Sequence, residues 1–295
     1  HGNILTPRLA YKWSITKNDI FRINAGTGFR VVNLFTEDHA ALTGAREVIV
    51  KEKLKPEQSY NVNVNYIKKK YLDNGGSGSI ELSGWYTYFT NVIFPDYETN
   101  ANQIIYDNLD GSAVTKGLSL NADLTLHNGF SFMLGGTLMD VSTEEAGIKQ
   151  RQILTERFTG TWSVSYKFMD NKFAVDYTGN VYGPMRLPIL GELDFRPDES
   201  PWWSIQNIQL TYKGLKSVEF YGGVKNLLNW TPWKNQDQPI IARSFDPFDR
   251  NVDFDADGNV LSTPQNLNAL TFDPSYVYAQ NQGIRGFFGI RYRIK

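Results

Sequence analysis

The 295-residue sequence contains no cysteine. Disulfide bonds, cysteine nucleophiles and cysteine-based metal motifs are therefore excluded. No stretch reaches the roughly 18 consecutive apolar residues of a transmembrane helix, so a helical membrane protein is excluded as well. The formal net charge is −1, which provides no general attraction to nucleic acid or to anionic lipid, and we expect no nucleic-acid partner.

Signatures of catalysis and of cofactor binding are also missing. The sequence has no G-x-S-x-G motif and no pair of histidines at metal-ligand spacing. Its three histidines, His1, His39 and His127, are far apart in the chain. We therefore expect a protein that is not an enzyme and that holds neither a resident cofactor nor a structural metal.

Aromatic residues make up 14% of the chain, and many of them alternate with polar residues. Residues 60–66, for example, read YNVNVNY, which puts tyrosine and valine on one side and three asparagines on the other. Alternation with period two predicts a β-strand, because successive side chains point to opposite faces. Eleven such strands are predicted, at residues 8–14, 21–25, 60–66, 80–88, 118–126, 130–138, 161–168, 173–181, 208–212, 218–225 and 284–294.

The connections between these strands alternate strictly in length. Short turns lie at 16–19, 72–78, 127–129, 169–171 and 213–216, and long loops at about 30–57, 91–113, 140–156, 183–201 and 227–282. In an antiparallel up-and-down sheet, all short turns then share one end, as in outer-membrane barrels. We find no helical period with caps and no linker, so the prediction is an all-β transmembrane β-barrel with Val62 and Val64 facing lipid and the asparagines facing the lumen.

The strand count constrains the architecture further. The first and the eleventh predicted strand run in the same direction, which a standard barrel with an even strand number and both termini in the periplasm does not allow. We therefore expect residues 1–295 to form the C-terminal part of a larger barrel, with an odd number of strands upstream.

Three motifs carry a family resemblance. GFR at 28–30 followed by LKPEQS at 54–59, GVKNLLN at 223–229 and the terminal RGFFGIRYRIK resemble, in this order, segments of the Bacteroidetes-type TonB-dependent outer-membrane receptors. Val31-Val32 stands where that family usually has Ala-Pro, and Ile294-Lys295 ends the chain where an aromatic residue is usual. The motif residues are Gly28, Phe29, Arg30, Leu54, Pro56, Glu57, Asn226 and Leu227.

The resemblance implies a barrel of about 22 strands with an N-terminal plug domain, which this chain does not contain. It further implies ligand capture by extracellular loops of a Gram-negative outer-membrane protein, and import driven by the TonB complex acting on the plug. Other implied partners are outer-membrane lipid and the barrel-assembly machinery. The expected ligand is an iron chelate, either a siderophore or heme; cobalamin and oligosaccharide are alternatives within the class. A passive porin, an adhesin-like barrel or an outer-membrane hydrolase is the alternative from other classes.

Several loop residues suit an anionic, aromatic chelate, because arginine forms planar bidentate bonds and aromatic rings stack. His39 is either an iron ligand for heme or an ordinary solvated loop histidine. The candidate ligand-binding residues are His39, Arg46, Arg186, Trp233 and Arg243.

Other patterns have plainer interpretations. Residues 253–258 match the first half of a calcium loop, but Pro264 stands where the bidentate Glu is needed, so a hairpin turn is preferred. Arg285, Arg291 and Arg293 share the lumenal face of the last strand, where, together with Lys225 and Arg22, they pair with plug carboxylates or guide an anionic ligand; pairing with the plug is preferred for Arg291 and Arg293. An interfacial aromatic girdle accounts for a further set of residues. The set is Trp202, Trp203, Trp230, Tyr86 and Tyr88.

The terminal strand predicts an assembly signal, formed by Gly289, Tyr292 and Ile294. Replacing Tyr292 and Ile294 with Asp in the full-length protein is expected to block outer-membrane insertion, because an unpaired strand edge in lipid leaves backbone groups unsatisfied. Surface display of the variant, measured on intact cells, is the test. Display at the level of the unsubstituted protein contradicts the prediction.

Overall fold

The computed structural model describes residues 5–30, 47–51, 54–73, 75–96, 99–100, 103–145, 147–188, 197–232, 252–267, 269, 272 and 277–293. These residues form fifteen β-strands and no helix. A helix of the length and hydrophobicity needed to cross a membrane is not found among them.

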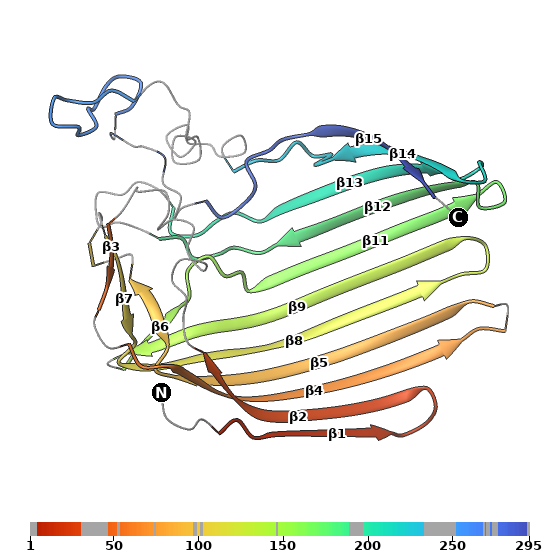
Figure 1. The fold of residues 1–295 in the computed structure, drawn as a ribbon, viewed down its shortest axis with the longest axis horizontal. Helices are drawn as coiled ribbons and strands as arrows, with labels where there is room; N and C mark the ends of the chain where they lie inside the picture. Colours follow the sequence, from red (N-terminus) through yellow and green to blue (C-terminus); the bar gives the residue numbers. More distant parts are fainter. Residues whose placement is uncertain are drawn as a thin grey trace.

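Eleven strands form one continuous antiparallel sheet in chain order, as predicted (Figure 1). They are β1 (Arg8–Ser14), β2 (Asp19–Arg30), β4 (Glu57–Tyr71), β5 (Ser77–Thr90), β8 (Gly111–Thr125), β9 (Phe130–Glu145), β11 (Phe158–Phe168), β12 (Phe173–Tyr182), β13 (Trp203–Tyr212), β14 (Val218–Lys225) and β15 (Arg285–Tyr292). A short twelfth strand, β10 (Ile148–Arg151), pairs with β9 beyond the main sheet. Within the described residues the sheet is curved but not closed, and β1 and β15 are its two edges.

The short turns lie at one end of the sheet and the long connections at the other, which confirms the predicted asymmetry (Figure 1). The β11–β12 connection is one of the short turns. Its residues Met169, Asp170 and Asn171 all adopt positive φ values, of 50°, 55° and 62°. Asparagine and aspartate tolerate this left-handed conformation better than most residues. The end with the long connections is called the loop end below.

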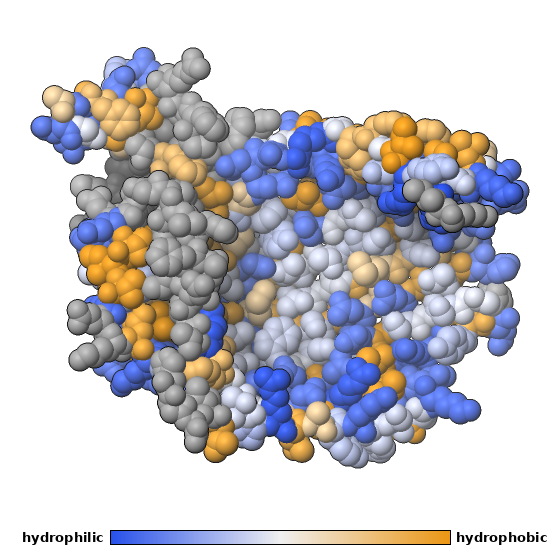
Figure 2. Space-filling model, viewed as in Figure 1, coloured by the Kyte–Doolittle hydropathy of each residue, from blue (hydrophilic) through white to orange (hydrophobic). Residues whose placement is uncertain are grey.

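The two faces of the sheet differ as the alternation predicts. Large apolar side chains on one face are unusually exposed, such as Val62 (42%), Leu120 (51%) and Phe288 (71%), and no described residue forms a second sheet over them. On the other face Asn65 donates to Glu81 Oε1 (2.6 Å) and to Ser83 Oγ (2.8 Å). Figure 2 shows a hollow over the central strands that is mainly blue and white. A water-facing concave side and an apolar convex side are those of a barrel wall in lipid.

A second, small sheet lies at the loop end. It consists of β3 (Glu47–Val50), β7 (Gln103–Asn108) and β6 (Ile93–Asp96), with β3 parallel to β7 and β6 antiparallel to it. Ile93, Ile104 and Tyr106 form its buried cluster. The sequence analysis did not predict this sheet, because strands of four to six residues carry too little alternation and because β3 and β7 come from two different loops.

The assignment of the faces can be tested with two neighbouring positions on β8. Replacing Leu120 with Arg puts a charge into lipid and is expected to cost about 2–4 kcal/mol if it lies near the bilayer midplane. The matched variant Asn121→Arg puts the same charge on the lumenal face, which Asn121 shares with its cross-strand partner Glu81. Folding yield in membranes, followed by heat-modifiable gel mobility, should fall for Leu120→Arg only. Equal losses for both variants would show that the faces are assigned wrongly.

Candidate functional site

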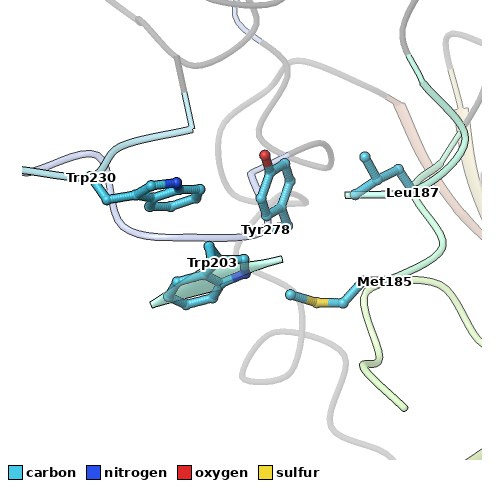
Figure 3. Packing of buried hydrophobic residues seen from close by; sticks show 5 residues of the cluster. All are labelled: Met185, Leu187, Trp203, Trp230 and Tyr278. Carbon is cyan, nitrogen blue, oxygen red and sulfur yellow. The ribbon is translucent and has the colours of Figure 1, made fainter. Parts of the chain in front are cut away.

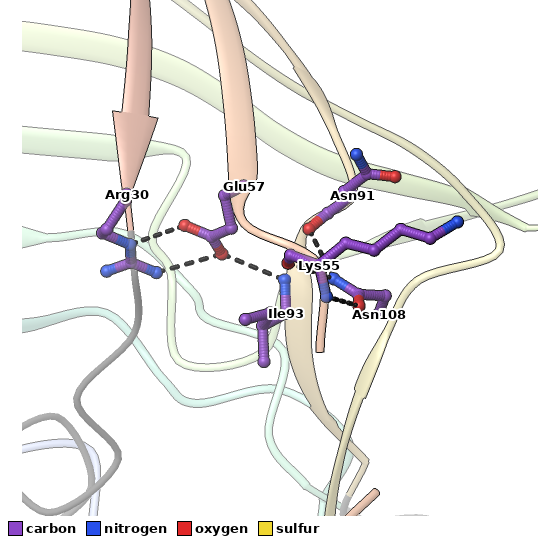
Figure 4. A network of polar contacts seen from close by, with 6 residues as sticks. All are labelled: Arg30, Lys55, Glu57, Asn91, Ile93 and Asn108. Carbon is purple, nitrogen blue, oxygen red and sulfur yellow. Dashed lines mark hydrogen bonds and ion pairs between the residues drawn. The ribbon is translucent and has the colours of Figure 1, made fainter. Parts of the chain in front are cut away.

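The first family motif forms a polar junction at the loop end. Arg30 ends β2 and Glu57 begins β4, and the two residues are partners across the strands. Arg30 Nε lies 2.5 Å from Glu57 Oε2, and Arg30 donates a second bond from Nη2 to Oε1 (3.1 Å). Glu57, only 6% exposed, also accepts a bond from the backbone N–H of Ile93 at 3.0 Å (Figure 4). One carboxylate therefore joins both sides of the 31–56 connection to the start of β6, through charge-assisted bonds.

Asn108 makes a second junction beside the first (Figure 4). Its Oδ1 accepts a bond from the N–H of Lys55 (2.6 Å), and its Nδ2 donates to the carbonyls of Lys55 (2.9 Å) and Asn91 (2.8 Å). Leu54, one residue earlier, packs against the buried cluster of the small sheet. The LKPE motif thus fastens the small sheet to the rim of the main sheet.

Gly28 belongs to the same motif for a steric reason. A Cβ atom at this position would overlap the hydroxyl of Ser59 on the neighbouring strand. Side chains paired across antiparallel strands compete for this space, and Ser59 can keep its position only because residue 28 has no side chain.

An exposed ion pair links the residue that follows β3 to β7 of the small sheet. Lys51 Nζ lies 2.6 Å from Asp107 Oδ2. The hydrogen bond from Lys51 lowers the pKa of Asp107, and the same bond raises the pKa of Lys51. The carboxylate contribution is therefore lost as pH falls through the lowered pKa of Asp107, and the ammonium contribution as pH rises through the raised pKa of Lys51. Both side chains are solvated, so the contribution of the pair to stability is small.

A cavity of about 810 Å³ lies between the small sheet and the rim of the main sheet. Arg30 and Glu57 are the charged residues in its lining, and they neutralise each other. Aromatic and apolar side chains line much of the remaining wall, together with a few hydroxyl and amide groups. The lining includes Phe29, Phe89, Val92, Phe94, Tyr106, Val141, Leu154, Gln58, Ser59, Thr115 and Gln152. A concave site that combines apolar and aromatic walls with polar groups is a usual form of a small-molecule pocket.

An aromatic cluster forms a third feature of the loop end (Figure 3). Trp203 and Trp230 stack with ring centroids 5.2 Å apart and planes at 15°, and Tyr278 and Met185 pack around them. Both tryptophans are buried, so their assignment to a membrane-interface girdle was wrong. Local alternation could not show that the connections around 185, 230 and 278 meet over Trp203. Trp202, Tyr86 and Tyr88 are exposed and fit that assignment.

Asn226 of the second family motif anchors this cluster. It is fully buried and has a φ of 52°. Its side chain donates to the carbonyls of Trp230 (2.7 Å) and Gln282 (3.1 Å) and accepts the N–H of Trp230 (3.1 Å). Asparagine suits this position because it tolerates the left-handed conformation and is both donor and acceptor. Leu227 follows, and its N–H donates to the carbonyl of Gln206 (2.8 Å).

Of the five predicted ligand-binding residues, the structure describes Arg186 alone. His39, Arg46, Trp233 and Arg243 lie outside the described residues. Arg186 lies at the loop end, half-buried, and its Nη1 donates to the carbonyl of Arg151 (3.1 Å) and to Gln150 Oε1 (3.4 Å). A role of these residues in ligand binding stays a prediction.

The DADG segment forms the preferred hairpin turn. Asp255 accepts bonds from the N–H groups of Asp257 (2.9 Å) and Asn259 (2.7 Å), and Gly258 has a φ of 85°. Bonds from the Asn259 side chain and backbone hold the pKa of Asp255 below its usual value. In the described ranges no group of three or more His, Cys, Asp or Glu residues could hold a metal ion.

Arg291 and Arg293, the lumenal arginines of the last strand that lie nearest the short turns, have a partner in their own sheet. Arg291 Nη1 lies 2.5 Å from Glu219 Oε1, and Arg293 and Lys213 approach Glu219 Oε2 at 3.8 and 3.6 Å. A plug carboxylate was expected from the sequence as the partner of Arg291 and Arg293, and Glu219 was not recognised in this role, although Glu219 alternates in phase with Tyr221 on β14. Tyr292, on the opposite face, is exposed, and the ring of Tyr221 lies over Gly289. Ile294 lies outside the described residues, and the assembly signal stays a prediction.

Comparisons with known proteins agree with this geometry. The family model "TonB dependent receptor-like, beta-barrel" matches residues 1–227. No match is found among the curated proteins. Similar solved structures include the copper transporter OprC (14% identity, TM-score 0.57, 75% of this chain and 33% of that one). The FrpB iron transporter of Neisseria meningitidis is similar at 13% identity and a TM-score of 0.57, with 76% of this chain and 35% of that one covered. The ferric enterobactin receptor PfeA of Pseudomonas aeruginosa, in a mutant form, is similar at 18% identity and a TM-score of 0.54, with the same two shares. The chain thus spans about a third of the length of these solved chains.

The Glu57 junction predicts a local loss of stability in the variant Glu57→Ala. The buried N–H of Ile93 and the guanidinium of Arg30 lose their partner, which is expected to cost about 1–3 kcal/mol. Hydrogen exchange of the intact receptor should show faster exchange at β6 and β7 and unchanged exchange in the centre of β8. Glu144→Ala, which removes an exposed carboxylate of β9, is the control. Unaltered exchange at β6 in the Glu57 variant would contradict a structural role of the motif.

Proposed function

Because the chain belongs to the TonB dependent receptor-like β-barrel family, we propose that the intact protein binds an iron chelate, a siderophore or heme, and imports it with energy supplied by TonB. Members of this family are transporters of the Gram-negative outer membrane rather than enzymes. The curved sheet, with its apolar convex face and polar concave face, is a part of the wall of such a transporter.

The substrate proposal is carried by the cavity at the loop end. Its volume of about 810 Å³ falls in the range of small-molecule pockets. Aromatic side chains of β5, β6 and β7 face the cavity, and such rings stack on the planar rings of a catecholate or of heme. Two of the similar solved structures are an iron transporter and a ferric enterobactin receptor, which supports the choice of iron.

We propose further that residues 1–295 are the C-terminal part of a larger barrel with a plug domain. The support is physical: β1 and β15 each have one open edge in the described sheet, and open edges are not tolerated in lipid. A plug would contribute part of the ligand site and the contact with the TonB complex. The barrel-assembly machinery and the surrounding lipid are the remaining proposed partners.

Cobalamin and oligosaccharides remain alternative substrates within the same class. The amide and hydroxyl groups of Gln58, Ser59 and Gln152 in the cavity lining would suit a sugar as well as a chelate. Copper is a further alternative, since one similar structure is a copper transporter.

Growth on single nutrient sources distinguishes these substrates. The source bacterium, with and without the intact receptor, is supplied with siderophore iron, heme, cobalamin, copper or a glycan as the only source. We expect the receptor deletion to abolish growth on one iron chelate and to leave the other conditions unchanged. A defect confined to a glycan, to cobalamin or to copper contradicts the iron assignment.

The same assay tests His39 as a heme ligand. If heme is the substrate, His39→Ala should abolish heme-dependent growth, because the imidazole supplies the bond to iron. The matched control His127→Ala changes a histidine in the β8–β9 turn at the opposite end of the wall. Unimpaired growth of the His39 variant on heme removes the ligand assignment.

A further inference from the structure

Two cations face each other on the lumenal side of the last strand pair. Lys225, the last residue of β14, is the cross-strand partner of Arg285, the first residue of β15. Like charges directly opposite each other destabilise a strand pair. Among the described residues neither side chain forms an ion pair; Arg285 donates to the amide oxygen of Gln282, and Lys225 Nζ lies 5.5 Å from the centre of the Phe287 ring.

The other end of the same strand pair is different. There Arg291, Arg293 and Lys213 share the carboxylate of Glu219, which is 91% buried as a side chain. The sheet therefore supplies an acid for its cations near the short turns and supplies none for the pair at the loop end. Among the described residues, Lys225 and Arg285 thus face each other without an ion-pair partner, and a bound anion would offset their repulsion.

Space for such an anion adjoins the pair. Lys225 and Arg285 line a lumenal cavity of about 540 Å³, whose wall also carries amide groups and the ring of Phe287. Asp176 lines the cavity as well, but its carboxylate accepts a hydrogen bond from the hydroxyl of Ser165 and, like the two cations, forms no ion pair among the described residues. Phe287 lies opposite Gly223, and its ring is tilted against Tyr221 at 6.4 Å. The cavity thus combines two cations with an aromatic surface.

We propose that Lys225, Arg285 and Phe287 form a lumenal subsite that binds an anionic aromatic group. The guanidinium and the ammonium bind the anion, the anion screens their repulsion, and the Phe287 ring stacks on the aromatic part. This assignment rests on the proposed function in one respect: the group belongs to the imported chelate, which would meet the subsite after leaving the loop-end cavity. Catecholate chelates carry this combination of charge and ring.

The test uses the intact receptor in detergent and two iron-free probes. Tiron is a catechol with two sulfonate groups, and catechol itself is its uncharged counterpart. Binding is measured by saturation-transfer NMR or calorimetry for the unsubstituted protein, for Lys225→Gln/Arg285→Gln and for the control Lys216→Gln in the β13–β14 turn. We expect the double variant to bind Tiron about tenfold more weakly, with catechol binding and the control unchanged. Added salt should weaken Tiron binding by the unsubstituted protein.

Two results would overturn the subsite. The first is equal Tiron binding by the double variant and the unsubstituted receptor. The second is a lowered unfolding temperature of the double variant with unchanged Tiron binding, which would assign the cations to a carboxylate of the plug. Failure of the proposed function looks different, because growth on iron chelates would then be independent of the receptor while Tiron still bound in a Lys225- and Arg285-dependent way.

Discussion

Every feature of this wall depends on one constraint: a peptide group in lipid has no water to bond with. An antiparallel sheet satisfies all backbone groups except those at its edges, so a chain without apolar helices can cross the bilayer only as part of a closed barrel. The eleven strands of the main sheet meet this demand with the simplest topology, in which each strand pairs with the strands of that sheet that come before and after it in the chain. Side-chain alternation follows from it, because one face of each strand meets lipid and the other meets the lumen.

The same constraint decides where specific polar contacts are placed. The backbone hydrogen bonds between neighbouring strands are sufficient to hold the strand centres. The long connections need additional side-chain hydrogen bonds where the strands end. Glu57 and Asn226 do this at two points of the rim, each with both a buried side chain and several hydrogen bonds. Residues that look like a family signature in the sequence are therefore structural residues, which position the small sheet and the aromatic cluster around the mouth of the lumen.

Two regions of the wall differ in what they offer a ligand. The loop-end cavity is aromatic and, through the Arg30–Glu57 pair, has little net charge in its described lining. The lumenal cavity beside Lys225 and Arg285 is lined by two cations, one carboxylate (Asp176) and one aromatic ring, that of Phe287. Under the proposed function, a planar anionic chelate would contact mainly rings in the first cavity and mainly charged groups in the second.

Much of the architecture was predictable from the sequence because its cause is local. Period-two alternation, as in YNVNVNY, marks each long strand and its lipid face, and the alternating lengths of connections give the topology without any knowledge of pairing. The small sheet was not predictable, since β3 and β7 are short strands from separate loops that pair only after the wall has brought them together. Tertiary structure likewise decided that Trp203 and Trp230 pack on each other and that Lys225 opposes Arg285, because cross-strand register and loop contacts join residues far apart in the chain.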